Sequence, residues 1–204
     1  MYTDITGIIL AGGKSSRMGE NKALLPFNGK TIIESISERV RSVFKNVMLI
    51  TNQPDDYSFL NMETFQDIYF GRGPLAGIHS GLMNSKTEKN FIISCDIPLV
   101  NKVIINFLVN YQTKQPITVL QADGFVQHLC GVYCKRLVSA AEEILNSIEK
   151  EMNEGKKCKC KMMEFLTIAE AEIIDSINIP FYKEGMFLNV NKPSDYQILL
   201  ETLS

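Results

Sequence analysis

The sequence predicts an α/β fold in three layers, with helices on both faces of a mostly parallel, Rossmann-like sheet. Strand-length apolar segments alternate with segments whose apolar residues recur at helical spacing, along almost the whole chain. Hydrophobic residues make up 45% of the chain and charged residues 22%, which are values typical of globular proteins. The length of 204 residues suits one α/β domain, so we expect a single domain over residues 1–204.

The first half of the chain is expected to contribute three strands and two helices. Thr31 and Glu34 have the spacing of a capping box, which predicts that a helix starts there. The apolar residues that follow recur at helical spacing as far as Phe44. Pro74 suits the first turn of the second helix, where a missing N–H costs least. The expected elements are a strand over residues 7–10, the helix from Thr31, a strand over 47–51, a helix over 75–84 and a strand over 91–95.

The second half is expected to alternate in the same way, with a less regular end. Gly155 predicts a loop inside a polar, basic segment, residues 153–161. The expected elements are a helix over 101–112, strands over 117–121 and 129–133, a long helix over 135–150, a short helix over 161–166, strands over 172–175 and 186–190, and a closing helix over 193–203. No internal repeat interrupts this pattern.

Charge and composition exclude several classes of partner. The 21 basic and 23 acidic residues give a net charge of -2, so no bulk field attracts nucleic acid or an anionic membrane. No apolar stretch approaches the ~20 residues of a membrane helix, and the first residues lack the basic start of a signal peptide. The five cysteines, an odd number, fit a reducing compartment. We therefore expect a cytoplasmic protein without nucleic-acid or membrane partners.

The ends of the expected strands predict where a ligand would bind. In mostly parallel sheets, ligands bind beyond the carboxyl ends of the strands. The strand over residues 7–10 runs into a glycine loop, Asn52 follows the second strand, and Asp96 follows the third. We therefore expect these three points to lie side by side and to form the site.

The loop after the first strand has the composition of a phosphate-binding segment. Gly12 and Gly13 lack a Cβ, so backbone N–H groups can approach a phosphate closely. Lys14, Arg17 and Lys22 add three cations, enough to offset most of the charge of a triphosphate. A glycine turn with solvated basic residues is the alternative to a phosphate site.

Two common nucleotide-binding loops do not fit this segment. A P-loop requires a glycine five residues before Gly13-Lys14-Ser15, where the chain has Ile8. The Gly-x-Gly-x-x-Gly fingerprint of dinucleotide-binding folds does not occur here either. Both loops are therefore rejected.

The longer pattern resembles the nucleotidyltransferases that activate sugars and cofactors with NTPs. Residues 10–22 read LAGGKSSRMGENK, which is similar to the LAGGxxxRMGxxK pattern of that superfamily. Three further segments resemble the molybdenum cofactor guanylyltransferases, which join GMP to molybdopterin. They are Gly73-Pro74-Leu75-Ala76-Gly77, Cys95-Asp96-Ile97-Pro98 and Leu188-Asn189-Val190-Asn191-Lys192-Pro193. Their order and spacing agree, so the resemblance covers nearly the whole chain and matches least over residues 153–177.

The resemblance implies a fold of the nucleotide-diphospho-sugar transferase type and an enzyme with Mg2+ as its cofactor. Such an enzyme transfers GMP from GTP to molybdenum-molybdopterin and releases pyrophosphate. Residues from about 1 to 100 would bind the nucleotide, and residues from about 101 to 204 would form the molybdopterin side. Molybdopterin synthesis proteins and recipient molybdoenzymes are the implied protein partners.

The functional residues of the family carry over onto matching positions of this chain. The expected catalytic residues are Asp96, Lys22 and Arg17. The expected GTP-binding residues are Leu10, Ala11, Gly12, Gly13, Lys22, Asn52, Asp67 and Asp96, and those on the molybdopterin side are Asn189 and Asn191. Asp96 is the expected metal ligand, because Mg2+ offsets the repulsion between reacting phosphates. Asp67 offers an acceptor to the N–H donors of guanine.

Each assignment has a structural alternative. Asn52 could be a turn residue and Asp67 a strand-end cap, while Asp96 could cap a helix beside Pro98. The asparagines of the last motif could form a turn. The basic run over residues 156–161 could help to hold the pterin phosphate, although a solvated loop is the commoner role of such a run.

Two rival functions are kept open. One is a relative that uses CTP or acts on a sugar phosphate, but CTP-using relatives tend to show LAAG where this chain has LAGG. The other is a nucleotide-binding regulator that has lost catalysis. Such a regulator would predict loss of Lys22 or Asp96, and both residues are present.

Overall fold

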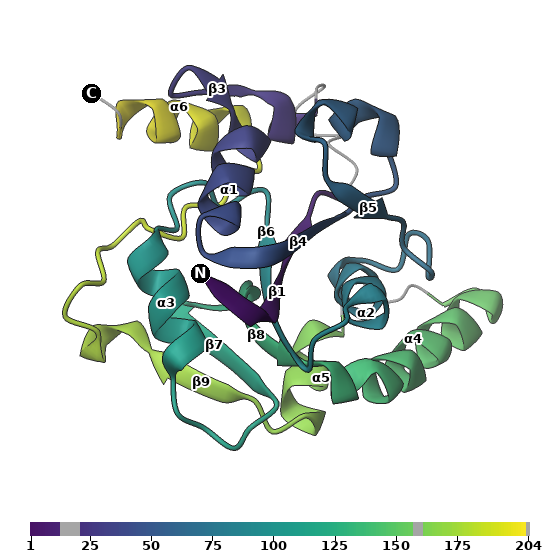
Figure 1. Cartoon of the computed structure of the whole chain (residues 1–204). Coiled ribbons are helices and arrows are strands. Elements are labelled where there is room, and N and C mark those ends of the chain that lie inside the picture. The colour runs from purple at the N-terminus through teal and green to yellow at the C-terminus, as the bar shows by residue number, and fades with distance from the viewer. Residues whose placement is uncertain (13–20, 157–160, 203–204) are drawn as a thin grey trace.

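The structure is a computed structural model that describes residues 1–12, 21–156 and 161–202 (Figure 1). Within those residues, the strands of the main sheet are β1 (Tyr2–Leu10), β4 (Phe44–Ile50), β5 (Glu63–Phe65), β6 (Lys89–Ser94), β7 (Ile117–Ala122), β8 (Phe125–Cys134) and β9 (Glu172–Asp175). The α-helices are α1 (Ile32–Arg41), α2 (Pro74–Asn84), α3 (Lys102–Asn110), α4 (Val138–Asn153), α5 (Met162–Ile168) and α6 (Pro193–Glu201). A small hairpin joins β2 (Pro26–Phe27) to β3 (Lys30–Thr31), and short 3-10 helices include η1 (Lys22–Leu24) and η2 (Pro54–Leu60).

The main sheet has the strand order β5-β4-β1-β6-β8-β7-β9. β1 pairs in parallel with β4 and β6, β4 pairs in parallel with β5, and β7 pairs in parallel with β9. Among these described strands, only β8 runs antiparallel to its neighbours. Leu10 lies opposite both Ile50 and Ser94, so β1, β4 and β6 end at the same edge of the sheet. The prediction of a mostly parallel sheet is confirmed.

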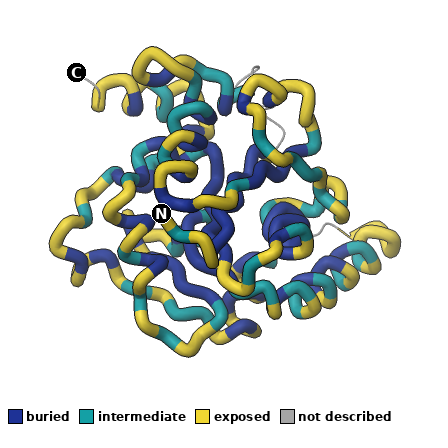
Figure 2. Tube along the Cα trace, viewed as in Figure 1, coloured by how far each residue is buried: buried dark blue, intermediate teal, exposed yellow. Residues whose placement is uncertain are grey.

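Helices cover both faces of the sheet, and each face has its own apolar core (Figure 1). Buried residues of α1, α3 and α6 pack on one face, and buried residues of α2, α4 and α5 pack on the other. The central strands and α2 are therefore mostly buried (Figure 2). Burial on both sides explains why these strands read as continuous apolar runs rather than alternating patterns. No helix in the described part of the chain is both long and apolar enough to span a bilayer.

The start of α1 forms as the capping box predicts, whereas its end does not follow the apolar pattern. Thr31 Oγ1 accepts the Glu34 N–H at 3.3 Å, and the Glu34 carboxylate accepts the Thr31 N–H at 2.7 Å. The helix ends at Arg41, and Phe44 already belongs to β4, so the prediction that helical spacing continues to Phe44 is wrong. Phe44 is buried in the same core as α1, so apolarity alone could not separate the two elements.

The strand expected over residues 186–190 does not form, which corrects the sequence prediction. This segment is a turn followed by irregular chain, and its Val190 N–H donates to the Asp96 carbonyl at 2.8 Å instead of joining a strand ladder. Conversely, β5 and the β2–β3 hairpin were not predicted, because strands of two or three residues are too short to show a period. The other expected elements form, most with ends shifted by a few residues.

Candidate active site

A cleft of about 960 Å³ opens where the strands end. Backbone hydrogen bonds hold the strand ends together: the Ala11 N–H donates to the Ile50 carbonyl at 2.9 Å, and the Cys95 N–H donates to the Leu10 carbonyl at 3.0 Å. The cleft is lined by Leu10, Ala11, Gly12, Asn21, Ile50, Thr51, Asn52, Gln53, Asp56, Asp67, Phe70, Gly71, Gly73, Pro74, Gly77, Ser94, Asp96 and Leu129. The fold thus brings together Gly12 beyond the end of β1, Asn52 beyond the end of β4 and Asp96 beyond the end of β6.

Lys22 is the partner of the Asp96 carboxylate, which lies two residues beyond β6. Its Nζ donates to Asp96 Oδ2 at 2.9 Å and to Asn191 Oδ1 at 2.7 Å. The side chains of Lys22 and Asp96 are 17% and 14% exposed, so solvent screens their attraction only weakly. One ammonium group therefore joins η1, the segment after β6 and the motif near the C-terminus.

Asp96 has a second carboxylate oxygen that suits a metal ion. Its Oδ1 is buried and has no hydrogen-bond partner among the described residues. A buried carboxylate oxygen normally has a donor or cation beside it. No group of three His, Cys, Asp or Glu residues in the described chain could hold a metal alone. One carboxylate completed by substrate phosphates is the arrangement in which Mg2+ is commonly bound, so the residues present fit this ion.

The alternative role of Asp96 as a helix cap is wrong. The next helix, α3, begins at Lys102, and its N-cap is Asn101. The Asn101 side chain accepts the N–H groups of Val103 and Ile104 at 2.9 and 3.1 Å. The residue that caps α3 is therefore Asn101, five residues after Asp96.

Asn52 and Asp67 form a hydrogen-bonded pair in the cleft. Asn52 Nδ2 donates to Asp67 Oδ2 at 2.8 Å, and Asn52 Oδ1 accepts the Asp67 N–H at 3.0 Å. Burial raises the pKa of the Asp67 carboxyl above its usual value, and the bond from Asn52 offsets part of that rise. A Cβ on Gly77 would lie 3.4 Å from Leu10 Cδ2 and 3.7 Å from Asp67 Oδ1. The absence of a side chain at Gly77 therefore keeps the space between Leu10 and Asp67 open.

Sequence reasoning missed Asn21, which fixes the backbone just before Lys22. Its Oδ1 accepts the Ala23 N–H at 3.2 Å and so caps η1. Its Nδ2 donates to Asp56 Oδ2 at 3.2 Å and to the Tyr57 hydroxyl at 3.0 Å. An asparagine directly before a helical turn is a capping signal, which could have revealed the first role. No pattern in the neighbouring sequence predicts the contacts of Asn21 with η2.

Other expected site residues do not line the cleft or lie outside the described residues. Asn189 does not line the cleft, and its side-chain amide donates to the Phe187 carbonyl at 3.0 Å, as in the turn alternative. Asn191 reaches the site through Lys22. The residues outside the described part of the chain are Gly13, Lys14, Arg17 and most of the basic run 156–161.

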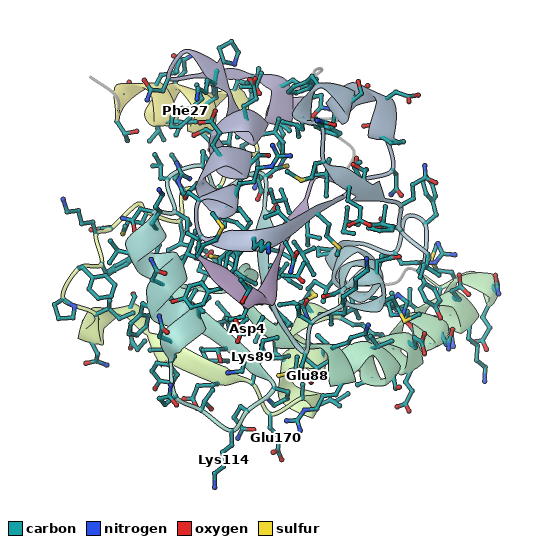
Figure 3. The ribbon with its side chains drawn as sticks, viewed as in Figure 1. Asp4, Phe27, Glu88, Lys89, Lys114 and Glu170 are labelled. Atoms are coloured by element: carbon teal, nitrogen blue, oxygen red, sulfur yellow. The ribbon has the colours of Figure 1, made fainter. Side chains whose placement is uncertain are left out.

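The charged side chains at the opposite edge of the sheet are remote from the cleft. Asp4, Glu88 and Lys89 gather where β1 and β6 begin (Figure 3). The cleft lies where those strands end. These residues therefore cannot contact a ligand in it.

Comparisons with known proteins agree with this geometry. Residues 7–157 match a family model described as the MobA-like NTP transferase domain. A curated Carboxydothermus hydrogenoformans protein named "Probable molybdenum cofactor guanylyltransferase" is 37% identical over 203 residues, which cover 98% of each chain. A Clostridium perfringens protein with the same name is 33% identical and covers 95% of this chain and 94% of its own.

The fold also has a solved counterpart. The crystal structure of molybdopterin-guanine dinucleotide biosynthesis protein A from Archaeoglobus fulgidus superposes with a TM-score of 0.74, covering 97% of this chain and 98% of its own at 19% identity. At that identity the likeness shows the fold alone. The chain belongs to the MobA-like NTP transferase family.

Proposed function

We propose that this protein is a molybdenum cofactor guanylyltransferase, which transfers GMP from GTP to molybdenum-molybdopterin and releases pyrophosphate. Curated relatives named for that activity align with nearly the whole chain and support the choice of substrates. The observation that carries the chemistry is the position of Lys22, paired with Asp96 and Asn191 beside the cleft.

The residues of the chain suit transfer between phosphates. An oxygen of the acceptor phosphate attacks the α-phosphorus of GTP, and the bond to the β-phosphate oxygen breaks, so pyrophosphate leaves with the electron pair. Lys22 supplies a cation where these anions meet, and a charge-assisted contact of this kind is worth about 1.5–3 kcal/mol. No general base is needed, because a terminal phosphate is already ionised at neutral pH.

Mg2+ is the proposed cofactor, and Asp96 is its proposed protein ligand. Asp96 Oδ1 is buried and has no hydrogen-bond partner in the described chain, whereas Oδ2 is paired with Lys22. When bound, the ion would supply charge neutralisation between the reacting phosphates and the departing pyrophosphate.

Guanine is the proposed base because the cleft offers it a carboxylate acceptor. Guanine presents N1–H and N2 amino donors, and the Asp67 carboxylate can accept from them. Asn52 holds Asp67 in place through two hydrogen bonds. Cytosine lacks that pair of adjacent donors, so a CTP-using activity is the weaker alternative.

The second half of the chain, from about residue 101, is the proposed molybdopterin side of one domain. Asn191 contacts Lys22, and the neighbouring Val190 is hydrogen-bonded to the Asp96 carbonyl, so this segment adjoins the reacting groups. Proteins of molybdopterin synthesis and recipient molybdoenzymes are the proposed partners, and the cytoplasm is the proposed location.

The test is pyrophosphate release from GTP, Mg2+ and molybdopterin, measured for the wild type, Lys22→Ala and Lys114→Ala. Lys114 is an exposed lysine far from the cleft and serves as the control (Figure 3). We expect Lys22→Ala to lower kcat/KM by about 10- to 100-fold, because a charged contact to phosphate is lost. Preferential use of CTP would favour the rival enzyme, and absence of release with any NTP would favour the regulator.

A further inference from the structure

The loop between β5 and α2, residues 66–73, is fastened to the wall of the cleft. Its Asp67 is held by the two hydrogen bonds to Asn52. The next residue, Ile68, donates its N–H to Ser80 Oγ of α2 at 2.9 Å. The start of the loop is therefore fixed beside the cleft by the sheet and by α2.

The same loop is also fastened to α4, which lies beside it (Figure 1). The Tyr69 hydroxyl donates to Asn146 Oδ1 at 3.0 Å, and its ring packs against the His79 ring in a T-shaped contact with centroids 5.2 Å apart. The Arg72 guanidinium lies 3.6 Å from the Glu149 carboxylate. Both sides of the loop tip are thus anchored.

Phe70 lies between these anchors and is left uncovered. Its side chain is 72% exposed and has no ring contact within the described chain. Ile68 is exposed too, but only Phe70 of these two lines the cleft. The residue after it, Gly71, has a φ of +72°, a conformation that favours glycine and turns the chain away from the tip. The loop therefore presents one large aromatic side chain to the cleft.

The charge distribution of the Phe70 ring indicates which part of a nucleotide would pack against it. The face of an aromatic ring carries partial negative charge, so it disfavours phosphate and favours the flat face of a base. Asp67, three residues earlier in the same loop, is the acceptor proposed for the edge of guanine, and the apolar Leu10 and Pro74 also line this cleft. The base is thus the part of GTP that belongs beside Phe70.

We propose that Phe70 stacks on the nucleotide base and supplies affinity, whereas Asp67 supplies the choice of base. This inference rests on the proposed function in so far as the nucleotide is GTP. Every base has an aromatic face, so stacking tolerates a change of base. Stacking is also made equally in the bound substrate and in the transition state, so its loss raises KM and leaves kcat unchanged.

The experiment measures Kd for GTP and for CTP, each with Mg2+, by calorimetry on the full chain. The variants are Phe70→Ala, Phe70→Trp and the control Phe125→Ala, since Phe125 is also 72% exposed but does not line the cleft. We expect Phe70→Ala to raise the Kd for each nucleotide by about 10-fold or more. The ratio of the two Kd values should stay within about 3-fold of the wild-type ratio. Phe70→Trp and Phe125→Ala should remain close to the wild type, and kcat of Phe70→Ala should be unchanged.

Several outcomes would overturn the stacking role. An unchanged Kd in Phe70→Ala, an equal loss in Phe125→Ala, or a loss for GTP alone would each do so, and the last would make Phe70 a reader of the base edge. The proposed function fails separately, if the wild type shows no preference for GTP. A Phe70-dependent affinity for whichever nucleotide binds would then still support stacking.

Discussion

At the scale of single residues, the geometry of Asp96 gives the strongest structural support to the proposed chemistry. One of its carboxylate oxygens accepts from Lys22, and the other is buried without a hydrogen-bond partner among the described residues. A purely structural aspartate would use both oxygens on neighbouring donors. The arrangement is therefore better suited to binding a cation than to stabilising the fold.

We expect Asp96→Asn to leave the fold intact and to abolish turnover. Asparagine keeps the size of aspartate and an oxygen that can accept from Lys22, but it loses the negative charge that holds a cation. GMP transfer should fall by ~100-fold or more, because several kcal/mol of charge stabilisation are lost. The measurement is a Mg2+ titration of the rate beside a melting curve of the same variant. A normal melt with wild-type turnover would place the metal ligand elsewhere.

Asp67 should show a conflict between stability and binding. Its folded-state pKa is raised by burial, so keeping this carboxyl ionised costs stability, and the cost appears as the pH rises through the folded pKa. Asp67→Asn removes that cost and keeps an oxygen that can accept from Asn52. We expect Asp67→Asn to melt higher than the wild type at pH 8, with the difference shrinking towards pH 4.

The same substitution should weaken GTP binding. An asparagine at this position replaces one acceptor oxygen by a donor, which opposes the donors of guanine. Preference for GTP over CTP, measured from the two Kd values, should therefore fall in Asp67→Asn. A variant that is unchanged in both preference and melting would show that Asp67 faces neither the base nor a desolvated environment.

At the scale of elements, η1 and η2 meet through Asn21. Tyr57 of η2 is only 4% exposed, and its hydroxyl both donates to Asn21 Oδ1 at 3.2 Å and accepts from Asn21 Nδ2 at 3.0 Å. Burial raises the pKa of Tyr57 to about 12, so the hydroxyl keeps its proton at any working pH. This contact fixes the backbone from which Lys22 extends.

We expect Tyr57→Phe to act on the site through Lys22. Loss of the hydroxyl removes hydrogen bonds to both polar atoms of Asn21, each typically worth about 0.5–1.5 kcal/mol, so the protein should melt lower. KM for GTP should rise as well, because the lysine is less well placed. Tyr196→Phe is the control, since it removes a hydroxyl that donates to the Pro26 carbonyl outside the cleft. A Tyr57→Phe variant with lower stability but unchanged KM would limit Tyr57 to a structural role.

At the scale of the whole molecule, the site joins segments from both ends of the chain. The bond from Lys22 to Asn191 spans 169 residues, and Val190 is tied to the end of β6. A ligand in the cleft would therefore contact groups supported by several elements and stabilise the fold as a whole. Such stabilisation follows RT ln(1 + [L]/Kd).

We expect GTP with Mg2+ to raise Tm more than the other nucleotides do. A ligand at ~100 Kd adds about 2.7 kcal/mol, which for a chain of this size is roughly 5–10 °C. CTP, ATP and UTP at the same concentration should shift Tm by less than about 2 °C, because each unpaired buried polar group costs about 1–3 kcal/mol. Thermal-shift measurements check this. Equal protection by all four nucleotides would contradict the guanine assignment.

The sequence determined those features that depend on neighbouring residues. The capping box at Thr31 and the proline that opens α2 are local, and both form as expected. The parallel sheet followed from alternating patterns, and with it the convergence of Gly12, Asn52 and Asp96, because the carboxyl ends of parallel strands share an edge. Four ordered motifs were enough to indicate the family.

Only the tertiary structure decided which side chains meet. The triad of Lys22, Asp96 and Asn191, the anchoring of Asn21 by η2, and the exposure of Phe70 depend on contacts between segments far apart in the chain. Residues 186–190 have the composition of a strand, yet their backbone bonds to the chain after β6. Local periodicity reports which face of an element is apolar, but it does not report which partner that element finds. The physical reason is that such pairings are fixed by packing of the whole sheet and its helices, not by the residues next to each other.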